Sequence, residues 1–170
     1  MYQFRIYIAL LFLILSISSC AVKKSSQSIY AFEKAKKIEE TFKELKNKKL
    51  PNFIKEWTGT PYKLGGMDKK GIDCSGFALL LQDQIFGVKL VRRSIEQALQ
   101  IEPKQVDELK EGDLIFFSFS GKDIDHVGVY LNNNYFVHAS TTRGVIVDDL
   151  RLAAYRNSIV KCGSVLKSNL

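Results

Sequence analysis

The chain has 170 residues, of which 46% are hydrophobic and 25% are charged, and this composition is typical of a globular domain with a buried core. Its three cysteines are too few for the disulfide framework of a small secreted domain. Most of the formal net charge of +7 lies in residues 21–50, with nine Lys and four Glu, whereas residues 51–170 hold 15 basic and 14 acidic residues, so the charge does not indicate nucleic-acid binding.

Residues 1–19 have the pattern of a secretory signal peptide. Arg5 precedes an unbroken apolar run over residues 6–15, which is shorter than the ~20 residues that a membrane-spanning helix needs. Small and polar residues then lead to Cys20. Residues 17–20, Ile-Ser-Ser-Cys, resemble the end of a bacterial lipoprotein signal, in which cleavage leaves the cysteine as a new N-terminus that carries lipid such as palmitate.

This resemblance implies that Cys20 anchors the protein to a membrane of the cell envelope. Ala21 follows Cys20, with no Asp at that position. In a double-membraned bacterium this pattern favours the outer membrane, with the protein facing the periplasm. Two alternatives stay open, namely an ordinary secretory signal with an incidental cysteine and an uncleaved membrane anchor.

Residues 20–50 form a predicted Lys-rich tether. Apolar residues recur there at alternating spacings of four and three, at Ala31, Ala35, Ile38, Phe42 and Leu45. The pattern predicts an amphipathic helix that ends at Pro51 and is too short for a coiled coil. We expect this helix to rest on the folded domain or to space it from the membrane.

The folded domain is predicted to occupy residues 51–170. Residues 52–58 predict a short helix, and a glycine-rich loop over residues 59–66 contains Tyr62. Later, Ser94 is predicted to start a helix and to form a capping box with Gln97. Residues 114–119 are β-branched and aromatic and predict a buried strand.

The stretch over residues 71–77, Gly-Ile-Asp-Cys-Ser-Gly-Phe, predicts a turn that leads into a helix. Asp73 is a good N-cap, apolar residues follow at helical spacing, and Gly87 supplies a stop. Cys74 then lies at a helix N-terminus, where the macrodipole favours the thiolate form of the side chain. A free cysteine is more often a small buried hydrophobe, so a catalytic role also requires a histidine nearby.

The only two histidines, His126 and His138, lie in one predicted hairpin of residues 125–131 and 135–140. If the loop is the three asparagines at 132–134, His138 lies opposite Gly128 and both imidazoles share one face of the sheet. A loop of even length would place them on opposite faces. The absence of a side chain at Gly128 is expected to leave room for the imidazoles to approach each other.

A last pair of strands, over residues 144–148 and 159–166, completes an antiparallel sheet. Cys162 lies in the second of these and fits a core position, although a disulfide between Cys74 and Cys162 stays open at this point. The residue types of Cys74, His126 and His138 fit the roles of a nucleophile, a base and a residue that orients the base. A metal site from the same three residues lacks a close-spaced pair of ligands, so we expect no metal.

Six motifs occur in a fixed order along the domain. They are Gly59-Thr60-Pro61-Tyr62 with Gly65-Gly66, Asp73-Cys74-Ser75-Gly76-Phe77, Arg92-Arg93-Ser94 with Gln97, Gly112-Asp113-Leu114-Ile115-Phe116-Phe117, His126-Val127-Gly128-Val129-Tyr130, and His138-Ala139-Ser140-Thr141. They resemble the successive motifs of the NlpC/P60 family of bacterial cell-wall cysteine peptidases, over about residues 52–166. The resemblance implies an α+β, papain-like cysteine peptidase fold, in which N-terminal helices pack on an antiparallel β-sheet.

The same resemblance implies a peptidoglycan endopeptidase. Members of the family hydrolyse amide bonds in stem peptides, typically between D-glutamate, through its γ-carboxyl, and the diamino acid that follows. By position, Cys74 corresponds to the nucleophile, His126 to the general base and later acid, and His138 to the orienting residue. The positions implied to contact substrate or the oxyanion are Tyr62, Asp73, Ser75 and Arg92.

Stem peptides and the membrane are the expected partners, and we expect a monomer without a cofactor or a nucleic-acid partner. Two alternatives remain. One is a Cys–His acyltransferase or amidase that acts on another envelope substrate, against which the order of the motifs counts. The other is a non-catalytic envelope-binding lipoprotein, which would normally have lost the cysteine or a histidine.

Overall fold

The computed structural model describes residues 28–165. Contacts divide the chain into two units, one up to Glu40 and one from Thr41 onward. In the first unit residues 28–40 are helical and mostly exposed. The predicted signal peptide and the predicted lipid anchor at Cys20 lie outside the described residues. None of the described helices is long and apolar enough to cross a membrane.

The second unit combines short helices with an antiparallel sheet. Its helical elements are α2 (Leu50–Trp57), α3 (Cys74–Leu81), the π-helix η1 (Gln82–Phe86), α4 (Ser94–Gln97), the 3-10 helix η2 (Val106–Glu108) and α5 (Ala153–Arg156). Its strands are β1 (Met67–Asp68), β2 (Gly71–Ile72), β3 (Ile101–Pro103), β4 (Leu114–Phe117), β5 (His126–Asn132), β6 (Tyr135–Ser140), β7 (Gly144–Asp149) and β8 (Ile159–Val165).

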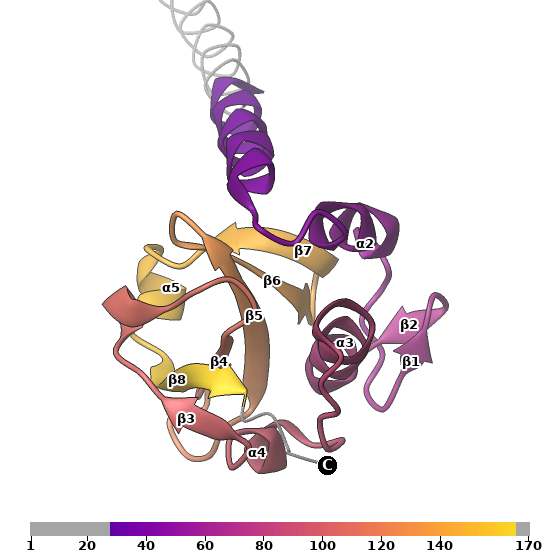
Figure 1. Ribbon diagram of the computed structural model, residues 1–170, viewed down its shortest axis with the longest axis vertical. Coiled ribbons are helices and arrows are strands. Elements are labelled where there is room, and N and C mark those ends of the chain that lie inside the picture. The colour runs from indigo at the N-terminus through magenta and orange to yellow at the C-terminus, as the bar shows by residue number, and fades with distance from the viewer. Residues whose placement is uncertain (1–27, 166–170) are drawn as a thin grey trace, which may run out of the picture. The chain divides into compact units, whose positions relative to one another are not determined.

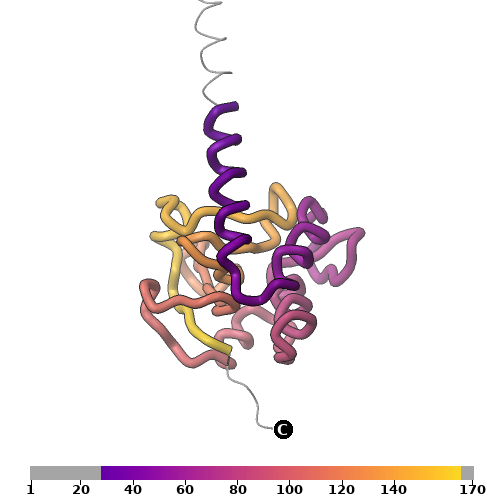
Figure 2. Tube along the Cα trace, turned by 45° about the horizontal axis from the view of Figure 1, so that its top comes forward, coloured from indigo at the N-terminus to yellow at the C-terminus, as the bar shows by residue number. Residues whose placement is uncertain are grey.

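Six of the strands form one sheet in the order β3-β8-β4-β5-β6-β7, and every neighbouring pair is antiparallel. Helix α3 packs against β5 and β6, and α2 lies near it at the same side of the sheet (Figure 1). The trace in Figure 2 shows the same grouping, with the strands of residues 101–165 together and residues 50–86 beside them. The predicted α+β, papain-like architecture is confirmed.

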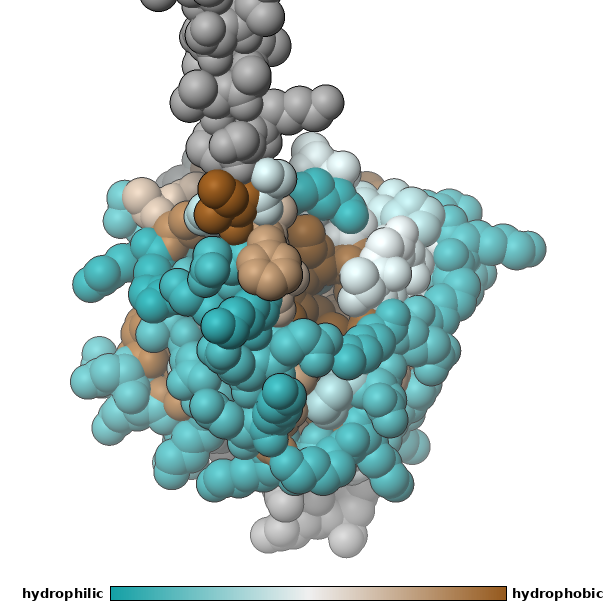
Figure 3. Space-filling view, turned by 90° about the horizontal axis from the view of Figure 1, so that it is seen from above, coloured by the Kyte–Doolittle hydropathy of each residue, from teal (hydrophilic) through white to brown (hydrophobic). Residues whose placement is uncertain are grey.

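An aromatic cluster joins α2 to α3. The ring centroids of Phe53 and Phe77 lie 6.0 Å apart, and those of Trp57 and Phe77 lie 6.3 Å apart. Full burial of such a side chain stabilises a fold by ~1.5–3 kcal/mol, so the cluster holds α3 firmly in the domain. On the face seen in Figure 3 most side chains are hydrophilic, with apolar groups showing between them.

The helix of the predicted tether ends earlier than expected. Residues 28–44 are helical, and Pro51 does not end this helix but lies in the first turn of α2. Proline is favoured there because its missing N–H would have no partner inside the helix. Phe42 and Leu45 are buried in the second unit. The division into signal peptide, tether and catalytic domain stays a prediction.

The predicted capping box at the start of α4 is wrong. The N-cap of α4 is Arg93, and no side chain caps it. Gln97 is instead buried, and its Nε2 donates to the backbone oxygens of Ser75 and Val91 at 3.0 and 2.9 Å. One buried and one partly buried carbonyl group therefore outcompete the helix end for this amide.

The hairpin turn also differs from the prediction, although the register does not. The turn has two residues, Asn133 and Asn134, with positive φ values of 53° and 63°, as a tight hairpin requires. A register shift between Tyr130 and Asn132 adds one residue to β5, so Val129 pairs with Val137. The extra residue in β5 therefore gives the same strand register as the three-residue loop that the sequence predicts.

Candidate active site

Cys74 is the first residue of α3, as the sequence predicts. Asp73 is the N-cap, and its carboxylate accepts from the backbone N–H of Gly76 at 2.7 Å. The helical path continues through η1 and ends at Gly87, which has a left-handed φ of 68°. The Cys74 side chain is buried, with 6% of the residue exposed.

The environment of the Cys74 sulfur differs from the prediction of a thiolate. Burial raises the pKa of the Cys74 thiol, and the negative charge of Asp73 adds to the rise. Hydrogen bonding from the backbone N–H of Val127 acts in the opposite direction without reversing it. The cost of desolvating a thiolate exceeds what the helix N-terminus contributes. The contact with Val127 also places the sulfur at the start of β5, where His126 is the preceding residue.

The two histidines lie together and are both buried. His126 Nε2 and His138 Nδ1 are 2.7 Å apart, and the rings are nearly perpendicular at 87°. The prediction that both imidazoles share one face of the sheet is therefore confirmed. Burial lowers the pKa of His126, and the positive charge that His138 can carry lowers it further, to about 3. His126 is neutral near pH 7.

Gly128 makes room for a phenyl ring and not for the imidazoles. A Cβ atom at this position would lie 2.6 Å from Cδ2 of Phe136. The Phe136 ring in turn stacks on His138, with centroids 4.8 Å apart and planes at 29°. The glycine therefore supports His138 indirectly, by admitting the ring that packs against it.

On its other side His138 meets a buried carboxylate that the sequence analysis did not single out. His138 Nε2 lies 3.3 Å from Oδ2 of Asp148, which is 1% exposed. Arg143 and the hydroxyl of Tyr155 also donate to Asp148. In β7 Asp148 lies two residues after Ile146, the partner of His138 across the strands, and so shares its face of the sheet. Only the β6–β7 register reveals this.

Arg92 binds groups of the chain itself beside Cys74. Its guanidinium donates to both Asp73 oxygens at 2.9 and 2.7 Å and to the Ser75 hydroxyl at 2.8 Å. Burial raises the pKa of Asp73, but hydrogen bonds from Arg92 and from backbone N–H groups outweigh it and hold the pKa below the ordinary value. Arg93, in contrast, is exposed and pairs with Glu96 at 3.4 Å.

Two hollows flank the cysteine and the histidines. One of about 360 Å³ is lined by Tyr62, Leu64, Gly65, Asp73, Cys74, Ser75, Arg92, Arg93, Ser94 and Asp125. The other, of about 480 Å³, is lined by Phe119, Asp125, His126, His138, Ser140, Thr141, Thr142, Arg143, Ala154 and Tyr155. Asp125 lines both, so the two hollows adjoin, and all seven predicted site residues of the domain lie in their walls.

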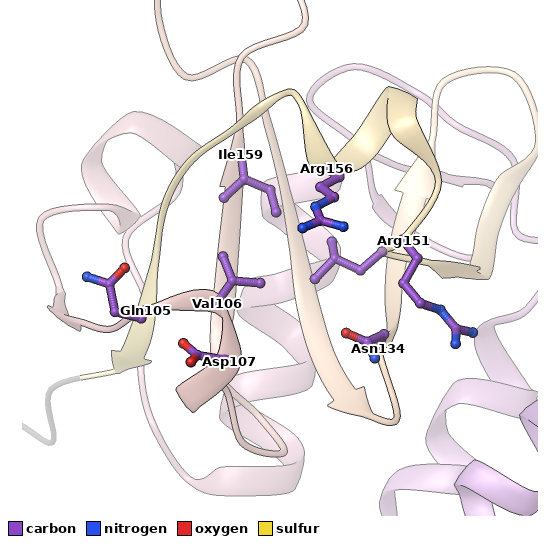
Figure 4. A pocket seen from close by; sticks show the side chains of 8 residues that line it. Gln105, Val106, Asp107, Asn134, Arg151, Arg156 and Ile159 are labelled. Atoms are coloured by element: carbon purple, nitrogen blue, oxygen red, sulfur yellow. The ribbon is translucent and has the colours of Figure 1, made fainter.

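A third hollow, of about 520 Å³, has none of the predicted site residues in its lining (Figure 4). Val106 and Ile159 point toward one another in it, whereas the Arg151 side chain points away. Within residues 28–165 no group of three or more His, Cys, Asp or Glu side chains is arranged to hold a metal ion. Cys74 and Cys162 are free thiols, so the disulfide left open by the sequence is not formed.

Comparisons with known proteins identify relatives of this chain. The chain is 44% identical over 102 residues to the probable endopeptidase NlpC of Escherichia coli K12, covering 59% of this chain and 66% of that protein. It is 44% identical over 95 residues to the murein DD-endopeptidase MepS/murein LD-carboxypeptidase of the same strain, covering 56% of this chain and 50% of that protein. The chain thus spans about half to two thirds of the length of these relatives.

Among solved structures, an NlpC/P60 family protein from Bacillus cereus matches with a TM-score of 0.63 and 29% identity, covering 69% of this chain and 39% of that one. The model of the NlpC/P60 family itself matches residues 59–163, a span that includes α3, the histidine hairpin and nearly all of the sheet. The chain therefore belongs to the NlpC/P60 family.

Proposed function

We propose that this protein is a peptidoglycan endopeptidase that hydrolyses an amide bond in stem peptides. The observation that carries the proposal is that Cys74, at the N-terminus of α3, contacts the backbone of Val127 at the start of β5, the residue that follows His126 of the buried His126–His138 pair. Cysteine and histidine in such an arrangement perform nucleophilic acyl transfer. The relatives named as endopeptidases support peptidoglycan as the substrate.

In the proposed mechanism Cys74 is the nucleophile, His126 the general base and then acid, and His138 the residue that orients His126. As the sulfur bonds to the amide carbon, the thiol proton passes to His126. The C–N bond then breaks, and protonated His126 donates that proton to the leaving amine. Water hydrolyses the resulting thioester and regenerates the thiol.

We expect the resting site to hold a neutral thiol and a neutral imidazole. Burial raises the pKa of Cys74 and lowers that of His126, so the proton stays on sulfur in the absence of substrate. A thiolate–imidazolium ion pair would require two charged groups to lose their hydration in a buried site. Proton transfer is therefore expected to accompany the attack on the substrate, which makes His126 a true general base.

Two groups can stabilise the oxyanion. The backbone N–H groups of a helix's first turn have no partner inside the helix, and Cys74 is in this position. Burial raises the pKa of Tyr62, and the negative charges that Cys74 and Asp73 can carry raise it further, so its hydroxyl stays protonated as a donor. Tyr62, Asp73, Ser75 and Arg92 form the substrate-binding wall next to Cys74.

We assign the cleaved bond to the link between γ-D-glutamate and the diamino acid, on the family resemblance. The full chain in detergent, reduced, is incubated with purified peptidoglycan and with soluble stem peptides, beside a Cys74→Ala variant. Mass spectrometry then identifies new ends. Cleavage at the γ-glutamyl bond, absent in the variant, supports the whole proposal. Cleavage at a D-alanyl bond would support the hydrolase activity but contradict the assignment of the γ-glutamyl bond.

Absence of cleavage, from protein shown to be folded and reduced, contradicts the endopeptidase. The acyltransferase and binding-protein alternatives would then apply. The lipid on Cys20, the outer-membrane location and the monomeric state are part of the same proposal and rest on the sequence. Mass spectrometry of the mature N-terminal peptide, beside a Cys20→Ala variant, tests the lipid directly.

A further inference from the structure

The carboxylate of Asp148 lies at the end of a chain of polar contacts that begins at His126. His126 Nε2 meets His138 Nδ1 at 2.7 Å, and His138 Nε2 meets Asp148 Oδ2 at 3.3 Å. The Tyr155 hydroxyl donates to the same oxygen at 2.6 Å. Arg143 donates from both terminal nitrogens to the carboxylate, and also to the Tyr155 oxygen at 3.0 Å.

These contacts fix which nitrogen of His138 carries the proton. Asp148 is ionised because Arg143 binds both of its oxygens, so it only accepts. The Tyr155 hydroxyl lies 3.5 Å from His138 Nε2, but its proton is already directed to Asp148. Asp148 and Tyr155 are therefore both acceptors toward His138 Nε2, which makes this nitrogen the donor in these contacts.

The protonation of His126 follows from that of His138. With its proton on Nε2, His138 presents the lone pair of Nδ1 to His126, which must then donate from its own Nε2. Nδ1 of His126 is left unprotonated. This is the one nitrogen of the pair that can accept a proton from a thiol.

The alternative, a positively charged His138, is disfavoured by charge balance. The carboxylate of Asp148 is already neutralised by the guanidinium of Arg143, and His138 and Asp148 are 2% and 1% exposed. A second positive charge on His138 would have to share this one buried carboxylate with Arg143. It would also place a proton on Nδ1 of His138 and reverse the direction of the bond to His126.

We propose that Asp148, held by Arg143 and Tyr155, is a positioning residue that sets the tautomer of His138 and through it leaves Nδ1 of His126 free to act as the base. Asp148 contacts no substrate and acts through His138. The inference deepens the proposed function and rests on the role given to His126 there. A carboxylate that orients a catalytic histidine has the same task in the Ser-His-Asp triad.

The tautomers are tested first, without any substrate. The chain has two histidines, so a sample with ¹⁵N-labelled histidine gives two imidazoles in a two-bond ¹H–¹⁵N spectrum near pH 7. Histidine-to-alanine variants assign them. We expect both rings to carry the proton on Nε2. A proton on Nδ1 of His138, in a neutral or a charged ring, would overturn the inference.

Kinetics of Asp148→Asn test the consequence. An amide has one acceptor oxygen, for which Arg143 and Tyr155 compete, so the Nε2–H form of His138 loses its support. We expect kcat to fall at least about tenfold with KM within about twofold, and a second His138 tautomer to appear. The matched control is Asp149→Asn, the same change at the next residue, which pairs with Arg151 at 2.7 Å.

A kcat of folded Asp148→Asn equal to that of Asp149→Asn contradicts the proposal. If Asp148→Asn does not fold, Tyr155→Phe removes one donor but keeps the carboxylate, and a smaller loss of kcat at unchanged KM is expected. Unchanged kcat would count against the network. If the wild-type protein cleaves no stem peptide, the proposed function fails, while the spectrum still decides the tautomers.

Discussion

His126 titrates far from an ordinary histidine because it is buried beside a second imidazole. Its pKa is lowered to about 3 by burial and by the charge that His138 can carry. In the unfolded chain a histidine has a pKa of ~6.5. Between pH ~3 and pH ~6.5, His126 is therefore protonated in the unfolded chain but not in the folded chain. The stabilisation from neutral His126 is therefore complete above pH ~6.5 and is lost as the pH falls toward 3.

The same shift predicts the acid side of the pH–rate profile. A general base must be unprotonated, so kcat/KM for a stem peptide is expected to stay within about twofold from pH ~7 to pH ~5, where an ordinary imidazole is mostly protonated. Initial rates are measured across this range, with circular dichroism at each pH as a check on folding. A half-loss near pH ~6.5 in folded protein would show that His126 titrates normally.

Gly128→Ala tests the packing behind His138. The new Cβ would meet Cδ2 of Phe136 at 2.6 Å, so the ring that stacks on His138 must move. We expect a loss of ~1–3 kcal/mol in the free energy of unfolding, the usual cost of overpacking, together with a lower kcat. Urea unfolding and initial rates are measured on the same sample. A variant with wild-type stability and kcat would show that Phe136 does not support His138.

The central part of this site could be predicted from the chain, and the part behind it could not. Cys74 was found from its cap and helix, and the histidines from their alternation in a hairpin. Asp148 reaches His138 only through the pairing of β6 with β7. Tyr155 belongs to the four-residue helix α5, which is too short to have a periodicity. No linear spacing signals such contacts.

Helix α4 is tied to the rest of the domain through one amide. Gln97 is fully buried, and its Nε2 binds the carbonyl oxygens of Ser75 in α3 and Val91 in the loop that also holds Arg92. The sequence placed this glutamine in a capping box because its spacing from Ser94 fits one. The spacing along the helix shows only which local groups the Gln97 side chain can reach. Its burial against the rest of the domain determines which groups it binds.

Gln97→Ala is expected to loosen this connection. Two carbonyl groups lose their partner, at ~1–3 kcal/mol for each that stays buried, so we expect the free energy of unfolding to fall by ~2 kcal/mol. KM should also rise, because the loop that carries Arg92 loses its anchor. Urea unfolding and steady-state kinetics measure both.

Gln100→Ala is the matched control, since Gln100 accepts from the Val91 N–H at 2.8 Å in an exposed position. The free energy of unfolding of Gln100→Ala is expected to stay within ~0.5 kcal/mol of the wild-type value. Equal effects of the two substitutions would show that the buried bonds of Gln97 have no special weight.

The elements that the sequence located best are those with a long pattern. The helix from Cys74 to the stop at Gly87 and the strands of the histidine hairpin were placed to within a residue or two. Strands β1, β2 and β3, of two or three residues each, were missed because so few residues show no alternation. The turn at 133–134 was misjudged because a bulge in β5 replaced the odd residue of the loop.

In the domain as a whole, the proposed site joins two parts that fold from separate stretches of chain. The cysteine comes from α3, and the histidines come from β5 and β6, 52 and 64 residues later. The distance between nucleophile and base therefore depends on how α3 is held against the sheet. Phe77 holds it, since its ring is fully buried and contacts Phe53 and Trp57 of α2.

Phe77→Ala is expected to cost stability and catalysis together. Removing a buried phenyl ring typically costs ~3–5 kcal/mol, a large share of the ~5–15 kcal/mol that stabilises a domain. The free energy of unfolding is measured in urea on the full chain in detergent. The control is Leu99→Ala, at a residue that is 77% exposed, and its free energy of unfolding is expected to stay within ~0.5 kcal/mol of the wild-type value. In the population that stays folded, α3 loses its contact with α2, so kcat should fall even after correction for the unfolded fraction. A variant that loses stability but keeps the kcat of its folded population would show that the sheet alone positions Cys74.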